Sequence, residues 1–147
     1  MKNIIKKTLL GIVLLATTNL SAGQIIANIN CPLSQRVLKG ETINVIRFQQ
    51  IFEGKIEKCT DGNIIQRFTL KEDNPIMEIF AQNIFKLSSI ELFHKWKSIE
   101  LTQGISKPTI LSSEERMVRT ISNIDNSVGM VSDETVLPPT VIKILSF

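Results

Sequence analysis

The sequence has few of the residues that build metal centres and catalytic sites. Its 147 residues include one histidine and two cysteines, and no Cys-x-x-Cys pair. His94 therefore has no histidine partner for a zinc site. It stands beside Lys95, and no serine or cysteine motif marks a nucleophile for it to activate. We expect His94 to lie at the surface, and we expect neither an enzyme nor a bound cofactor or metal.

Long apolar runs are also scarce. The longest near the start, Leu9–Ala16, has eight residues, whereas a transmembrane helix needs about 20. It follows a basic segment and precedes the small residues Ser21–Gly23. This pattern predicts a signal peptide over residues 1–23, cut after Ala22 or Gly23, and hence a periplasmic or secreted protein. A retained membrane anchor is the alternative. The basic segment contains Lys2, Lys6 and Lys7.

An excess of positive charge is absent from the predicted mature chain. The whole sequence has 17 basic and 14 acidic residues, and residues 1–23 hold three lysines and no acid. Without that segment the two signs balance. Nucleic-acid binding needs a clustered basic face, so we expect no nucleic-acid partner.

The remaining residues 24–147 have the length of one domain. Cys31 and Cys59 would then reside in an oxidising compartment, where an even cysteine count favours a disulfide. A bridge closing a loop of this size stabilises a fold by about 3–4 kcal/mol. Two unpaired, partly buried thiols are the alternative.

Apolar periodicity predicts the first strand and helix. Ile25–Ile29 has the composition of a buried strand, and we expect a loop from there to Glu41. Thr42 or Asn44 can cap the following helix, and Gly54 suits the left-handed position after its end. The apolar face of this helix consists of Val45, Phe48, Ile51 and Phe52.

Turn and cap signals divide the middle of the chain. Asp61-Gly62 predicts a turn before a strand at Ile64–Leu70. Three helices then begin at Asn74-Pro75, at Ser88 and at Ser112. The last two starts have the capping-box pattern with Glu91 and Glu115, respectively. The aromatic residues at helical spacing are expected in the core; they are Phe48, Phe52, Phe80, Phe93 and Trp96.

Two closing strands are predicted at Val128–Val131 and Val141–Leu145. The order of elements, β-α-β-α-α-α-β-β, predicts an α/β domain with a mixed sheet flanked by helices.

The segment Ile51–Ile56 with Asp61-Gly62 resembles the "IFxGK…W-x-DG" signature of periplasmic phosphate-binding proteins, the substrate-binding components of phosphate ABC transporters. Phe80 and Trp96 are similar to the family's "F…W" segment. The resemblance covers about residues 43–146. It implies one lobe of a periplasmic-binding-protein-like fold, as in short single-domain relatives. Later matching segments are the helix Ser113–Ile121, the "pGaIGYV" strand at Asn126–Val131 and the "VKvL" strand at Val141–Leu145.

The resemblance also implies where a ligand would bind. The family holds phosphate partly at a Ser-Gly-Thr loop that opens a helix, and Asp73-Asn74-Pro75 stands at that place here. Asp73 adds negative charge and Pro75 has no N–H, so both oppose phosphate capture. Cys59 and Met130 replace the tryptophan and tyrosine of the family motifs.

Three residues are candidates for ligand binding, and each has a plainer interpretation. Asp73 and Asn74 can line a site at the helix start or simply cap the helix. Arg67 can bind an anion near the same helix or lie solvated on a strand. Two further sets of charges have structural interpretations. Glu114-Glu115 suits the positive end of a helix, and the charges of Glu53–Lys58 suit a solvated face.

Two functions follow. The first is an exported solute-binding-like protein for phosphate or another small oxyanion, working with an ABC permease. The second is a non-transport periplasmic accessory or interaction protein that kept the lobe and lost the ligand site, with another envelope protein as its partner.

Overall fold

The computed structural model describes residues 22–58 and 62–147. The five-stranded sheet has the order β3-β2-β4-β1-β5. Strands β2, β3 and β4 run parallel, and β1 runs antiparallel to its neighbours β4 and β5. The strands are β1 (Gly23–Asn28), β2 (Gln66–Leu70), β3 (Thr109–Leu111), β4 (Ser127–Ser132) and β5 (Val141–Ser146).

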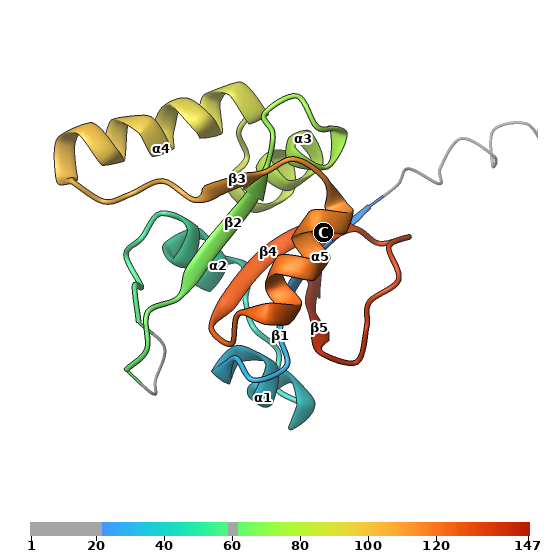
Figure 1. Cartoon of the computed structure of the whole chain (residues 1–147). Coiled ribbons are helices and arrows are strands. Elements are labelled where there is room, and N and C mark those ends of the chain that lie inside the picture. Colours follow the sequence, from blue (N-terminus) through green and yellow to red (C-terminus); the bar gives the residue numbers. More distant parts are fainter. Residues whose placement is uncertain (1–21, 59–61) are drawn as a thin grey trace, which may run out of the picture.

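Helices cover both faces of this sheet (Figure 1). Helices α3 and α5 both contact β1, β2 and β4, and in Figure 1 α5 lies in front of the sheet whereas α3 lies behind it. Helix α5 packs at Gly129, where an added Cβ would lie 2.4 Å from the sulfur of Met117. The helices are α1 (Pro32–Leu38), α2 (Val45–Phe52), α3 (Pro75–Phe80), the π-helical η3 (Ala81–Phe85), α4 (Ser89–Gln103) and α5 (Glu114–Asn123).

The core contains an aromatic cluster built from α2, α3, η3, α4 and the chain end. The ring centroids of Phe52 and Phe80 lie 5.1 Å apart, those of Phe80 and Phe147 5.5 Å, and those of Phe93 and Trp96 5.2 Å. Trp96 is 2% exposed. The edge-to-face geometry of these pairs adds to the stabilisation from burial. The prediction that the aromatic residues form the core is confirmed, with Phe93 partly buried at its margin.

Most local signals act as predicted. The Asn44 side chain accepts a hydrogen bond from the Arg47 N–H and caps α2, and Gly54 has φ +76° just after that helix. Ser88 and Glu91 form the predicted capping box of α4. The mixed α/β sheet and its helical cover are those of the predicted fold class.

Three predictions about elements are wrong. The expected loop from residue 30 to Glu41 contains α1, which begins at Pro32 because proline suits the first helical position. Ser113, not Ser112, caps α5 by accepting from the Arg116 N–H. The strand expected from Ile64 begins at Gln66.

Strand β3 had no counterpart in the prediction. Strand β3 follows the loop marked by Gly104 and Pro108, and η3 continues α3. In the part of the chain that the structure describes, no helix is long and apolar enough to cross a bilayer.

Candidate functional site

The carboxyl ends of four strands meet at one edge of the sheet. Strands β2, β3 and β4 are parallel, and β5 shares the direction of β4 because both are antiparallel to β1. We call this end of the sheet the carboxyl edge and define it by residues 71–74, 112–115 and 133–135. Ligands of open α/β sheets bind outside such an edge. Asp73 and Asn74 lie here.

Asn74 is the N-cap of helix α3. Its side-chain oxygen accepts a hydrogen bond of 2.9 Å from the Ile76 N–H, and its own N–H donates to the Lys71 carbonyl oxygen at 3.0 Å. Its carbonyl oxygen accepts from the Met77 N–H at 2.9 Å. The capping interpretation of Asn74 is therefore confirmed, and its side-chain oxygen and both backbone polar atoms serve the turn and the helix.

Acidic side chains surround the pocket beside this turn. The pocket has a volume of about 590 Å³ and is lined by Lys71, Glu72, Asp73 and Glu78 together with uncharged residues of α3 and α4. A hydrogen bond from the Ser89 N–H (2.9 Å) and one from Gln82 lower the pKa of Glu78. Three carboxylates and one ammonium group repel an oxyanion more than they attract it.

Arg67 does not join Asp73 and Asn74. It is the second residue of β2, at the strand end away from the carboxyl edge. Its guanidinium donates to the Phe52 carbonyl oxygen at 2.9 Å and to the Ser106 carbonyl oxygen. Burial lowers its pKa, and the charge of Glu57 opposes that shift. Arg67 thus bonds the end of α2 and the loop before β3, where it serves the fold.

Glu53 is a buried charged residue, although the sequence pattern predicts that its side chain is solvated. It is 7% exposed, and its carboxylate oxygens lie 2.8 Å from Lys55 Nζ and 2.9 Å from Lys95 Nζ. Burial alone raises the pKa of Glu53, but the hydrogen bonds and charges of the two lysines outweigh burial and lower it. Lys95 also lies 5.8 Å from the Phe85 ring centroid. The expectation of a solvated face is wrong for Glu53, which links α2 to α4.

A basic pocket lies between α1 and α2. It has a volume of about 260 Å³, and its lining includes Arg36 and Arg47. Arg36 bonds Glu41 at 2.6 Å. The Arg47 Nε is buried and has no hydrogen-bond partner among the described residues. No sequence motif marks this pair, although both arginines belong to segments flanking one short loop.

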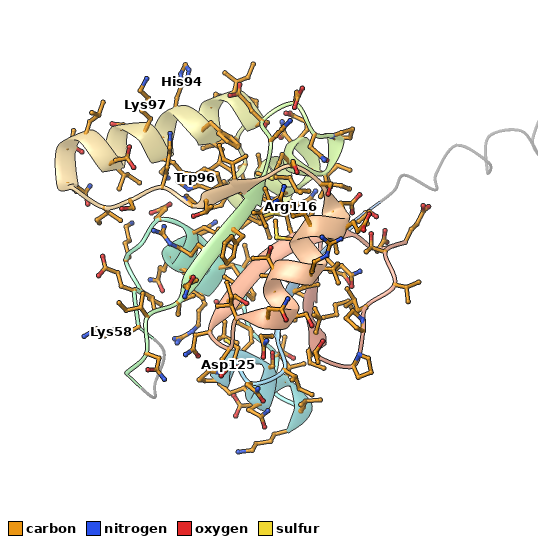
Figure 2. All side chains as sticks on the ribbon, viewed as in Figure 1. Lys58, His94, Trp96, Lys97, Arg116 and Asp125 are labelled. Atoms are coloured by element: carbon orange, nitrogen blue, oxygen red, sulfur yellow. The ribbon has the colours of Figure 1, made fainter. Side chains whose placement is uncertain are left out.

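The labelled side chains of α4 point in two directions. His94 and Lys97 project outward from α4, whereas Trp96 points inward (Figure 2). Within residues 22–58 and 62–147 no three metal-binding side chains cluster.

Cys31 is buried at the start of α1, but Cys59, Asp61 and residues 1–21 lie outside the described residues. The Cys31–Cys59 bridge, the turn at Asp61-Gly62 and the signal peptide therefore stay predictions.

Comparison with known proteins shows what this fold resembles. No family model and no curated protein matches the chain. Among solved structures, it is similar to an ABC-type phosphate transport receptor from Vibrio cholerae, at 14% identity and a TM-score of 0.52. It is also similar to a phosphate ABC transporter substrate-binding protein from Clostridium perfringens, solved with bound phosphate, at 13% identity and a TM-score of 0.58.

Each similarity extends over most of this chain but over less than half of the solved protein. Each covers 84% of this chain, but only 45% of the Vibrio protein and 44% of the Clostridium protein. The chain therefore has a periplasmic-binding-protein-like fold, and the part that matches corresponds to less than half of each of these two proteins. The resemblance to phosphate-binding proteins that the sequence motifs indicate is confirmed at the level of the fold.

Proposed function

We propose that this chain is an exported module built on the solute-binding lobe, and that it works as an accessory or interaction protein of the cell envelope. This chain matches less than half of each receptor, so the proposal concerns this lobe alone. The proposal assigns no catalytic step, cofactor or metal to the chain. Its partner is another envelope protein, with an ABC permease as one candidate.

The main support for this proposal is the turn between β2 and α3. An oxyanion site at this turn needs free N–H groups, hydroxyl donors or positive charge. Asn74 is committed to the cap, Pro75 has no N–H, and Glu72, Asp73 and Glu78 make the pocket acidic. These features oppose the capture of phosphate by this lobe alone.

Calorimetric titration of the protein with phosphate and sulfate tests the proposal. We expect no saturable heat at millimolar anion concentration, which corresponds to a binding free energy weaker than about −4 kcal/mol. Saturable binding at lower concentration would reject the interaction role as the primary one.

The second candidate is a solute-binding-like protein for phosphate or another small oxyanion. The similarity to two phosphate receptors supports it. The Arg36–Arg47 pocket is a candidate place, because its lining is basic and the buried Arg47 Nε has no hydrogen-bond partner among the described residues. If an anion binds there, Arg47→Gln should weaken it at least about tenfold. Arg116→Gln is the control, because Arg116 is exposed on α5.

The place of export cleavage is part of the proposal. Gly23 is already in β1, and its N–H and carbonyl oxygen pair with Phe147. A cut after Ala22 leaves this strand complete, whereas a cut after Gly23 removes its first residue. Intact-mass measurement of the secreted protein distinguishes the two cuts, and an uncleaved chain in the membrane fraction would contradict export as a soluble protein.

A further inference from the structure

We propose that the groove beside α5, together with the carboxyl edge, docks a basic peptide segment of a partner protein. One apolar side chain of that segment would occupy the groove, and its lysines or arginines would lie against the carboxylates of the edge. This inference rests on the proposed interaction role and adds to it the surface and the chemistry of the partner.

The groove lies between α5 and the loop that joins β4 to β5. It has a volume of about 460 Å³, and most of its exposed surface is apolar. Val118, Val136 and Pro138 contribute this apolar surface, and Val136 is 88% exposed. Its lining on α5 extends from Glu114 to Asn123, which spans about 13 Å at 1.5 Å per residue. An extended peptide of about four residues has this length.

Hydrogen bonds hold the wall of the groove in place. The Glu114 carboxylate accepts from the Ser132 N–H and from the Thr135 hydroxyl at 3.0 Å. The Gln24 side-chain amide donates to the carbonyl oxygens of Ser132 (3.0 Å) and Thr135 (3.2 Å). These bonds fix the loop to α5 and β1. A preformed groove costs less ordering entropy when a ligand binds.

The carboxyl edge beside the groove is mostly acidic, and the lining of the groove itself contains Glu114, Glu115 and one basic residue, Arg119. The carboxyl edge carries one lysine, Lys71, and six acidic side chains. Glu115 pairs with Arg119 at 2.8 Å, but Asp133 and Glu134 have no lysine or arginine nitrogen within 4.0 Å among the described residues. The six acids are Glu72, Asp73, Glu114, Glu115, Asp133 and Glu134.

The combination of an apolar groove and an acidic rim favours one kind of occupant. An anionic membrane surface or a free oxyanion meets like charge here. A basic segment that carries an apolar residue satisfies both features, because rim charges steer association and a buried apolar side chain supplies affinity. The groove length suits a short extended segment better than a folded domain.

Fluorescence anisotropy with a labelled Lys-Lys-Leu-Lys-Lys peptide tests this proposal on the mature protein. We expect saturable binding that weakens as ionic strength rises from about 0.05 to about 0.5 M. The peptides Glu-Glu-Leu-Glu-Glu and Lys-Lys-Ser-Lys-Lys should bind at least about tenfold more weakly, the first through charge and the second through the lost apolar side chain.

Three variants locate the binding. Asp133→Lys/Glu134→Lys and, separately, Val136→Ser should each weaken the peptide about five- to tenfold, while Asp125→Lys should change it less than about twofold. Asp125 is an exposed acid at the opposite end of the sheet (Figure 2). Val136→Ser alters an exposed side chain, so it keeps the test valid if the charge reversal fails to fold.

Several outcomes would overturn the proposal. These are absence of peptide binding at millimolar concentration, equal loss with Asp125→Lys, and concentration-dependent self-association that Val136→Ser abolishes, which would make a second copy the occupant. A photo-crosslinker at Val136 separates the two proposals. A partner that co-purifies with the protein but does not crosslink from Val136 keeps the interaction role and rejects this surface. Anion binding beside intact peptide docking keeps this surface and rejects the interaction role as the primary one.

Discussion

At the scale of single residues, Glu53 shows how a charge can be structural rather than functional. Its carboxylate is almost fully buried and lies between two lysines from different segments. We expect Glu53→Gln to lower the free energy of unfolding by about 1–3 kcal/mol at neutral pH, because both ammonium groups lose a charged partner. Urea unfolding measures this, with Glu115→Gln as the exposed control, expected to cost under about 0.5 kcal/mol.

The pH dependence of this contribution follows from the lowered pKa of Glu53. Folding favours the ionised carboxylate, so its stabilisation is complete above the ordinary value of 4.5 and is lost as pH falls through the lower folded-state value. The difference between wild type and Glu53→Gln should therefore shrink on acidification. A difference that grows at low pH would contradict this assignment.

A second residue-scale prediction concerns Gly54. It has φ +76°, and an added Cβ would lie 2.3 Å from the Ile105 side chain. Gly54→Ala should therefore cost more than the roughly 1–2 kcal/mol of left-handed strain alone. Gly40→Ala is matched in backbone, with φ +88° and no atom within 4 Å of the added Cβ. Thermal unfolding compares the two, and equal losses would show that Ile105 moves aside freely.

At the scale of elements, the two neighbouring serines at the start of α5 have different roles. The Ser113 side chain accepts from the Arg116 N–H, whereas no such bond involves Ser112. Ser113→Ala should lower stability by about 1 kcal/mol and Ser112→Ala by only a few tenths. Denaturant midpoints of both variants decide this, and the opposite order would restore the capping box with Glu115 that the sequence favours.

Helices and strands of this chain differ in how far local sequence predicts them. Helices α2, α3 and α4 begin at residues whose side chains cap them, so a few adjacent positions carry the signal. Strand β3 has three residues, two of them exposed, and exists because it pairs with β2 about 40 positions earlier. No local pattern encodes that pairing.

At the scale of the whole molecule, the predicted disulfide would tie the start of α1 to the turn before β2. Cys31 is buried at that helix start. We expect thiol counting under denaturing, non-reducing conditions to find no free thiol in the exported protein. Reduction should then lower stability by about 3–4 kcal/mol. Two free thiols in the oxidised sample would remove the bridge.

The sequence indicates where the candidate site lies, but it does not show whether the site can bind an anion. The turn at Asp73-Asn74 was found because a family motif and a helix cap coincide there. The sequence suggests that Arg67 lies near the same helix, but the strand carries Arg67 to the other end of the sheet. The acidity of the carboxyl edge was also invisible, because its charges come from three segments far apart in the chain.

The sequence by itself determined the α/β class, the starts of α2, α3 and α4, the left-handed Gly54 after α2 and the aromatic core, because caps, glycines and apolar periodicity act over a few residues. Only the tertiary structure decided the burial of Glu53, the role of Arg67, the addition of β3 and the joining of the acidic edge to an apolar groove. Each of these depends on contacts between distant segments, and such contacts leave no local pattern.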